Sequence, residues 1–332
     1  MEEKLPFENR EEVVIVKKKA VTSPDYGSEP DKRSVEQLIN YGVVNINKPA
    51  GPTSHQISAY VKNILGIDKA GHSGTLDPNV TGVLPVALAK GTRVVQALLN
   101  AGKEYVCLMR LHQDVEEKKI IEAFKKFTGS IKQLPPVKSA VKRQVRRRNI
   151  YYINIIEILH HEEIKKKEIL FRIGCEAGTY IRKICHDLGQ ELEVGAHMQQ
   201  LIRTKAGPFK DNDWVSLQDL KDAYVFWKDE NNETEIRKCI KPFERAVDHL
   251  PKIWVLDNAV DTLCHGASLS VPGVSKFNEF SQGQSVAIMT LKSELIGLGE
   301  AKMGSLKLLN EERGIVVTKT KIFMDRGIYT KK

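Results

Sequence analysis

The fold of this 332-residue chain is best approached through the stretch Gly71-His72-Ser73-Gly74-Thr75-Leu76-Asp77-Pro78. Residues 70–82 are too rich in Gly, Thr, Asp and Pro to form a regular element, so we predict a loop there. The carboxylate of Asp77 has two interpretations. It either caps a turn, with Pro78 at the first following position, or acts as a nucleophile on a ligand that the glycines allow to approach the backbone. The loop by itself does not decide between them.

Helices and strands alternate irregularly on both sides of this loop. We predict strands over 42–49, 104–111 and 198–204, a hairpin formed by 150–159 and 168–175, and helices over 91–99, 115–127, 179–192, 217–227 and from Thr53 or Ser54 to Gly66. This order is typical of an α+β fold with a mixed, largely antiparallel central sheet and flanking helices. It does not fit a doubly wound sheet.

The pattern divides the chain into three parts. Residues 1–40 are polar and rich in turn signals, and we expect an N-terminal extension that packs on the C-terminal domain. Residues 41–250 hold the mixed elements and predict the main domain. Residues 251–329 are short segments separated by glycines, which predict a small C-terminal β-barrel.

A strongly basic segment lies within the main domain of a chain whose formal net charge is +9. Six cations fall within eleven residues without an intervening acid: Lys138, Lys142, Arg143, Arg146, Arg147 and Arg148. Such a run is usually a solvated face, but mutual repulsion here favours an anionic partner. The adjacent Tyr151 and Tyr152 are residues of a kind that stacks on unpaired bases. The segment therefore predicts a contact with nucleic acid.

The remaining composition excludes several classes of protein. The five cysteines are odd in number and never form Cys-x-x-Cys, which fits reduced thiols in a cytoplasmic protein. No apolar run approaches the ~20 residues of a membrane span, and no signal peptide is visible. No metal-ligand or phosphate-loop motif is present, so we expect neither a metal nor a cofactor.

Two further residues are candidates for a site. Arg182 follows Thr179-Tyr180-Ile181 into a predicted helix and falls in its first turn, where the helix dipole disfavours a cation. It is either a solvated surface arginine or one with an anionic partner. Tyr105 lies in a strand between apolar residues, and a core tyrosine is the ordinary explanation.

Five segments in order resemble the TruB/dyskerin family of pseudouridine synthases across residues 40–250. They are Lys48-Pro49-x-Gly51-x-Thr53-Ser54, the stretch 71–78, Gly102-Lys103-x-Tyr105, Gly178-Thr179-Tyr180-Ile181-Arg182 and Leu201-x-Arg203-Thr204. The resemblance implies the pseudouridine synthase fold, and the C-terminal segment is similar to a PUA domain, an RNA-binding module. The resemblance also implies an enzyme that converts uridine to pseudouridine without a cofactor.

The resemblance also implies roles for single residues. Asp77 matches the catalytic aspartate of the family, Tyr105 the tyrosine stacked on the target base, and Arg182 the arginine paired with the aspartate. The implied pocket further includes His72, Tyr180 and Leu201. The target nucleotide would have to leave its helix to reach them.

The N-terminal extension and the basic segment resemble the archaeal dyskerin type. This implies RNA partners (tRNA, rRNA and a box H/ACA guide RNA) and small accessory proteins of the box H/ACA particle. The alternative is a catalytically silent RNA-binding scaffold, against which the intact set of Asp77, Tyr105 and Arg182 speaks.

Overall fold

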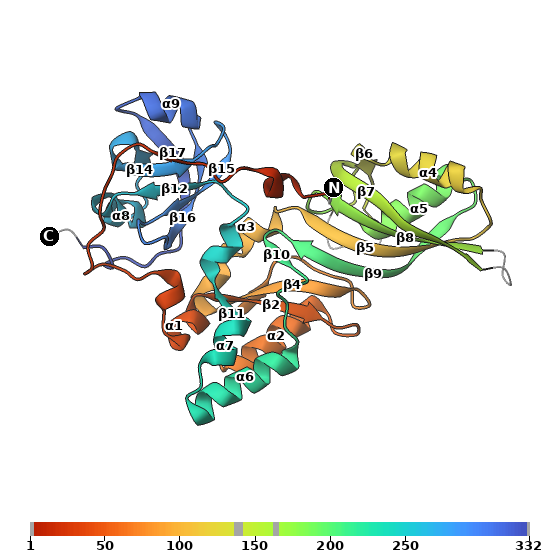
Figure 1. Ribbon diagram of the computed structural model, residues 1–332, viewed down its shortest axis with the longest axis horizontal. Coiled ribbons are helices and arrows are strands. Elements are labelled where there is room, and N and C mark those ends of the chain that lie inside the picture. The colour runs from red at the N-terminus through yellow and green to blue at the C-terminus, as the bar shows by residue number, and fades with distance from the viewer. Residues whose placement is uncertain (1–2, 136–141, 162–165, 331–332) are drawn as a thin grey trace.

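The computed structural model describes residues 3–135, 142–161 and 166–330. Figure 1 shows two lobes joined side by side, each organised by one sheet. The larger sheet has ten strands from residues 42–242. The smaller has seven strands, six from residues 252–322 and one, β1 (Val14–Val16), from the N-terminal part. The predicted α+β fold with a mixed, largely antiparallel sheet is confirmed.

The larger sheet has the strand order β11-β2-β4-β9-β5-β8-β7-β6, with β3 paired to β4 and β10 to β9. Its strands are β2 (Gly42–Lys48), β3 (Ala70–His72), β4 (Thr81–Leu88), β5 (Lys103–Leu111), β6 (Gly129–Gln133), β7 (Arg146–His161), β8 (Lys166–Cys175), β9 (Ala196–Ala206), β10 (Phe209–Lys210) and β11 (Ile240–Pro242). The contact between β4 and β9 is parallel, with Gly82 opposite Arg203. This short contact joins the two halves of the sheet.

Each half of the larger sheet has its own apolar core. Helices α2 (Ser54–Leu65) and α6 (Leu217–Glu230) pack on the half that contains β2 and β4. Helices α4 (Glu117–Lys126) and α5 (Ile181–Glu191) pack on the half that contains β5, β8 and β7. The shorter helices of this lobe are α1 (Val35–Asn40), η3 (Ala89–Val94), α3 (Val95–Leu99), α7 (Thr234–Cys239) and η5 (Phe243–Val247). Of the helices described, none is long and apolar enough to cross a membrane.

The C-terminal lobe is a sheet of order β1-β14-β12-β15-β16-β17-β13. Its elements are β12 (Lys252–Val255), α8 (Asp257–Cys264), β13 (Leu269–Ser270), η6 (Val271–Gly273), β14 (Val274–Asn278), β15 (Ser285–Met289), β16 (Leu295–Ala301), α9 (Ser305–Asn310) and β17 (Ile315–Ile322). A shared apolar cluster joins it to the larger lobe, where Trp254, Met289 and Phe323 pack with Val43 and Phe243. The two lobes therefore form one continuous interior.

The N-terminal extension contacts both lobes, as the red trace in Figure 1 shows. Strand β1 pairs antiparallel with β14, with Ile15 opposite Phe277. Just before it, η1 (Pro6–Asn9) lies on the larger sheet, and the side chain of Leu5 is fully buried there. After η2 (Pro30–Lys32), the guanidinium of Arg33 donates to both carboxylate oxygens of buried Glu244 at 2.8 Å.

The predicted helix that follows Pro52 is confirmed, and local capping sets its two ends. The helix predicted between Thr53 and Gly66 begins at Ser54 because the Thr53 hydroxyl accepts from the backbone N–H of Gln56 and the Gln56 side chain accepts from the Thr53 N–H. It ends at Leu65 because Gly66 adopts a left-handed conformation, with φ +63°.

Two predicted segments are partly wrong. Residues 70–82 are not one loop, because Ala70–His72 form β3 against β4 and β4 already begins at Thr81. Three residues are too few for an alternating pattern to indicate a strand, and only the pairing with β4 defines it. Residues 91–99 form the 3-10 helix η3 followed by α3 rather than one helix.

The contact between β4 and β9 depends on the missing side chain of Gly82. A Cβ atom at this position would lie 2.3 Å from the backbone oxygen of Arg203, and its φ is +103°. We expect Gly82→Ala to lower the free energy of unfolding by about 3 kcal/mol or more, because both clash and strain oppose the native backbone. Denaturant titration of the purified protein measures this.

The matched control is Gly129→Ala. Its φ is +94°, but a Cβ there meets nothing within 4 Å. It should cost only the strain, about 1 kcal/mol. Equal destabilisation by both variants would contradict the importance of the close approach.

Candidate active site

A cavity of about 530 Å³ opens where β4 meets β9. The loop before β4, the end of α3, the strands β5 and β9 and the first turn of α5 surround it. Its lining residues are Gly74, Thr75, Leu76, Asp77, Val80, Leu99, Lys103, Tyr105, Gly178, Thr179, Tyr180, Ile181, Arg182, Met198, Leu201 and Arg203. Four of the five segments quoted from the sequence thus meet in one place.

Lys48 binds the backbone of the loop that carries Asp77. This lysine is fully buried, and its ammonium donates to the carbonyl oxygens of Pro49 at 2.8 Å and of Pro78 and Val80 at 2.9 Å. Burial, and then the charge of Arg203, lowers the pKa of Lys48. The ammonium donates to three carbonyls of this part of the chain, and so fixes the backbone on both sides of residue 79.

Ser54 at the start of α2 holds the same loop on its other side. The Ser54 hydroxyl accepts from the backbone N–H of Leu76 at 2.9 Å and lies 3.2 Å from the Leu76 carbonyl oxygen. The N–H of Gly51 donates to Pro78 at 3.0 Å. The segment 48–54 is therefore the support of the Asp77 loop, and this explains why it accompanies that loop in the sequence.

Asp77 and Arg182 form an ion pair across the mouth of the cavity. Arg182 is the second residue of α5, so the expected position in the first turn is correct, and its anionic partner is Asp77. The side chains are 50% and 45% exposed. A pair this accessible contributes at most about 1 kcal/mol to stability. Its main effect is to orient the carboxylate.

Tyr105, Leu201 and Arg203 form the floor of the cavity on β5 and β9. Arg203 is 1% exposed, and its guanidinium donates to the carbonyl oxygens of Val83 at 2.7 Å and Gly74 at 3.3 Å. Burial raises the pKa of the Tyr105 hydroxyl, while the charge of Arg203 beside it acts in the opposite direction. Tyr105 is therefore neutral near pH 7.

Tyr180 is placed through its backbone. Its N–H donates to the side-chain oxygen of Gln133 at 2.8 Å, and its carbonyl accepts from the Gln133 amide at 3.1 Å. Gln133 is 2% exposed and ends β6. This reciprocal pair fixes the chain at the residue preceding α5, two residues before Arg182.

His72 lies in β3 and is not among the described residues that line the cavity. Its Nδ1 accepts from the N–H of Gly74 at 3.3 Å. Its ring packs edge-on against the ring of His55, with the two ring centroids 4.8 Å apart. Burial, reinforced by the charges of His55 and Arg203, lowers the pKa of His72 to about 4. A neutral His72 thus shapes the turn that leads to Asp77.

The basic segment reaches the rim of the cavity. Arg146 and Arg148 line a small depression with Gln133 and Tyr180, and Arg148 donates to the carbonyl of Gly178 at 3.2 Å. Lys142, Arg143 and Arg147 are exposed, whereas Lys138 lies outside the described residues. The six cations are therefore not equivalent, because Arg148 also supports the loop before α5.

One expectation for this segment is wrong. Tyr152 is 4% exposed, and its hydroxyl donates to Glu104 at 2.5 Å, so it is not free to stack on a base. Tyr151 is half-buried beside Gly102. The register between β7 and β8 shifts between Ile150 and Tyr152, and adjacent letters in a sequence do not reveal such a bulge.

Three buried cations were not assigned to the site by sequence. Two of them are Lys48 and Arg203, and the third is Lys103. Lys103 donates to the carbonyls of Leu98, Leu99 and Ala101 at 2.6–3.0 Å, and burial lowers its pKa to about 7. All three belong to the quoted segments, and the signal that could have found them is a charged residue inside an apolar strand or next to one. Within the described ranges, His, Cys, Asp and Glu side chains form no cluster of three or more that could hold a metal ion.

Models of known protein families match nearly the whole chain. The matches are the DKCLD domain over residues 2–58, the TruB family pseudouridylate synthase N-terminal domain over 62–181, the tRNA pseudouridylate synthase B C-terminal domain over 182–248 and the PUA domain over 251–323.

Whole relatives and solved structures agree with these matches. A probable tRNA pseudouridine synthase B of Pyrococcus furiosus is 53% identical over 329 residues, covering 98% of this chain and 95% of the relative. The probable tRNA pseudouridine synthase B of Methanosarcina barkeri is 51% identical, and the match covers 99% of this chain and 95% of the relative. A Cbf5-Nop10-Gar1 complex contains a chain that is 52% identical with a TM-score of 0.91, covering 99% and 98%. An H/ACA RNP bound to a substrate RNA containing 2′-deoxyuridine contains one that is 49% identical with a TM-score of 0.90, covering 98% and 99%.

Fold, cavity and relatives define the class of protein: this is a pseudouridine synthase, an enzyme that isomerises uridine in RNA. Within that class the chain belongs to the TruB family and carries a C-terminal PUA domain. The family resemblance of the five sequence segments is confirmed.

The role of Lys48 as support of the Asp77 loop is testable. We expect Lys48→Met to lower the free energy of unfolding by about 3 kcal/mol, because the carbonyls of Pro49, Pro78 and Val80 lose the ammonium that donates to them. Single-turnover pseudouridine formation should slow at least tenfold, because the loop loses its anchor. Lys62→Met, on the exposed face of α2, is the matched control and should change neither quantity. A wild-type rate in Lys48→Met would contradict this role.

Proposed function

We propose that Asp77 is the catalytic nucleophile of a synthase that modifies specific uridines in tRNA and in rRNA, the latter as catalytic subunit of a box H/ACA guide-RNA particle. The observation that carries the proposal is the Asp77–Arg182 ion pair at the mouth of a cavity with Tyr105 on its floor. The carboxylate is accessible, oriented and next to an aromatic face.

The reaction breaks the N1–C1′ bond of uridine and forms a C5–C1′ bond, so no atoms are gained or lost. Asp77 serves it by attack on C1′, by addition to the base or by assisting removal of a ribose proton. Arg182 holds the carboxylate toward the substrate, and the neutral ring of Tyr105 offers a face for the base. Leu201 and Met198 add apolar surface to the lining beside that ring.

Tyr180 and His72 act on the shape of the pocket. Gln133 places Tyr180 at its rim, next to the arginines of β7. His72 fixes the turn at Gly74 and presents a buried Nε2 that has no partner among the described residues. Both support a nucleotide turned out of its helix.

The delivery of RNA rests on surfaces outside the cavity. The PUA domain and the exposed cations Lys142, Arg143 and Arg147 are suited to bind the phosphate backbone. Structures of related chains with Nop10, Gar1 and substrate RNA support a guide RNA and small accessory proteins as partners. The names of close relatives support tRNA as a second substrate.

We also propose a division of the chain into three parts. We assign residues 1–40 to an extension that packs on the C-terminal domain, 41–250 to the catalytic domain and 251–329 to the PUA domain. The pairing of β1 with β14 supports the first assignment. Five free cysteines support a cytoplasmic location.

The nucleophile is tested by Asp77→Asn. We expect at least a 1,000-fold loss of pseudouridine formation, because an amide is not a nucleophile, with RNA affinity within about threefold of wild type. Asp187→Asn is the matched control, since it also removes an α5 ion pair, with Lys183, outside the cavity. It should retain activity.

The same assay identifies the substrate. The wild type is given a tRNA transcript alone, and then a target RNA with guide RNA and accessory proteins. Activity in Asp77→Asn would exclude this residue as nucleophile, and an inactive wild type with every RNA would favour the scaffold alternative.

The exposed cations predict salt-dependent binding. Changing Lys142, Arg143 and Arg147 together to Gln should weaken RNA affinity and reduce the slope of log Kd against log salt by about 2, because fewer counterions are released. The control changes Lys118, Lys119 and Lys125 to Gln, three exposed cations on α4. An equal effect of both triple variants would mean that the basic segment is an ordinary solvated surface and not a specific RNA contact.

A further inference from the structure

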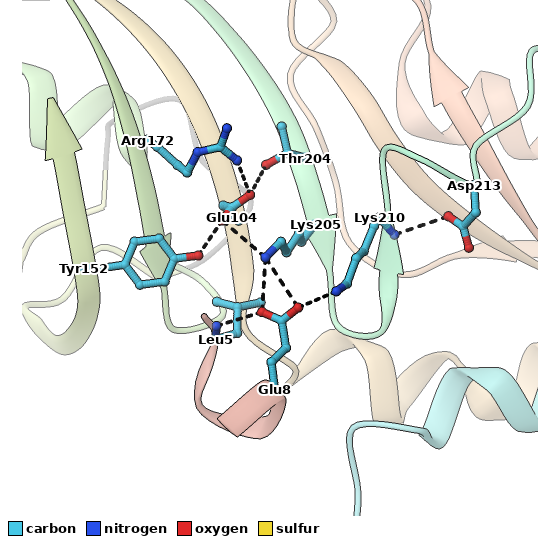
Figure 2. Close-up of polar contacts among 9 residues, drawn as sticks. All are labelled: Leu5, Glu8, Glu104, Tyr152, Arg172, Thr204, Lys205, Lys210 and Asp213. Carbon is cyan, nitrogen blue, oxygen red and sulfur yellow. Dashed lines mark hydrogen bonds and ion pairs between the residues drawn. The ribbon is translucent and has the colours of Figure 1, made fainter. Parts of the chain in front are cut away.

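Directly behind the floor of the cavity lies a buried polar cluster on the opposite face of the sheet (Figure 2). Its centre is Glu104 on β5, which is 1% exposed. Its carboxylate accepts from the hydroxyl of Thr204 at 2.7 Å and from the guanidinium of Arg172 at 2.9 Å. The Lys205 ammonium lies 3.5 Å away. Glu104 precedes Tyr105, so the cluster and the cavity share one strand.

The contact between β5 and β9 contains a β-bulge at this point. Glu104 is opposite Lys205, but Tyr105 is opposite Arg203, so Thr204 is an extra residue without a partner on β5. Opposite residues point to the same face of a sheet, whereas consecutive residues point to opposite faces. Arg203 therefore shares the cavity face with Tyr105, and Lys205 shares the rear face with Glu104. A regular strand would have placed Arg203 and Lys205 on one face.

The extra residue is held by a single side-chain contact that the structure records. The Thr204 side chain is 6% exposed, and its hydroxyl donates to the Glu104 carboxylate. A hydrogen bond to a buried carboxylate is stronger than one between neutral groups. Removing the hydroxyl takes away the hydrogen bond that the Thr204 side chain makes among the described residues, and so favours a slipped register.

The N-terminal extension completes the cluster. Glu8 of η1 lies 3.1 Å from the Lys205 ammonium and 2.7 Å from that of Lys210, and its carboxylate also accepts from the N–H of Leu5 at 2.8 Å. Lys205 is thereby placed between two carboxylates, Glu8 and Glu104. The extension thus covers the rear of the bulge.

We propose that Glu104 and Thr204 are positioning residues for the isomerisation: they fix the bulge that keeps Arg203 beside Tyr105 in the cavity, and Glu8 closes the cluster through Lys205. This rests on the proposed function of the cavity. Without the bulge, Arg203 leaves the carbonyls of Val83 and Gly74, and the turn before Asp77 loses a donor.

The test compares Thr204→Val with Thr204→Ser under single-turnover and steady-state conditions, using the RNA that wild type modifies. Val keeps the shape of Thr and removes the hydroxyl, whereas Ser keeps the hydroxyl. We expect Thr204→Val to lower kcat at least tenfold with KM and RNA Kd within about twofold, because the reacting groups are displaced while RNA surfaces are intact. Thr204→Ser should retain kcat within about threefold.

The matched control for lost stability is Thr290→Val in the C-terminal lobe. Thr290 is fully buried; its hydroxyl donates to a Glu294 carboxylate oxygen at 3.2 Å and accepts from the Glu294 N–H at 3.1 Å. It should lose similar thermal stability and keep kcat. If Thr204→Val has wild-type kcat, or loses only RNA affinity, the proposal is overturned.

Two further results keep the test decisive. Should Thr204→Val not fold, Glu8→Gln replaces it, with kcat expected about threefold lower and KM unchanged; an unchanged kcat there overturns the proposal. The proposed function fails separately, through an active Asp77→Asn or an inactive wild type.

Discussion

The parallel contact between Gly82 and Arg203 is the constraint on which the structure depends. It joins two half-sheets that are otherwise antiparallel and that have separate cores. Because the loop with Asp77 leads directly into β4, the same contact brings that carboxylate to the strand that carries Leu201 and Arg203. The cavity exists at the seam between the halves, and a side chain at residue 82 would hold them apart.

Buried cations support this seam through backbone carbonyls. Lys48, Lys103 and Arg203 each donate to backbone carbonyls. Burying a charge is costly, and carbonyl dipoles offset part of that cost when they converge on it. The arrangement fixes loop backbone more tightly than an apolar side chain can. It also leaves a positive potential around Asp77, the acid among the described residues that line the cavity, which suits a polyanionic substrate.

Much of the fold could be predicted where the signal is local. The cap at Thr53, the stop at Gly66 and the first-turn position of Arg182 are set by neighbouring residues, and the order of five segments identified the family. Short strands such as β1 and β3 could not be predicted, because they exist only through pairing with β14 and β4. The residues proposed for the site, from exposed Asp77 to buried Leu201, came from the family resemblance of their segments. The supports of the site, such as Gln133 and the bulge at Thr204, depend on register between strands that no single segment encodes.

The pairing of β1 with β14 has a consequence for how the protein is made. The side chain of Asn278 donates to the carbonyl of Val13, a residue 265 positions earlier in the chain. On the ribosome, the first strand of the C-terminal sheet is synthesised long before the strand it pairs with, so it must wait unpaired while the larger domain emerges. Contacts of such long sequence separation form late and slow the final step of folding. Docking of the N-terminal extension on β14, which also seats Glu8 behind the catalytic floor, therefore has to follow synthesis of the C-terminal sheet.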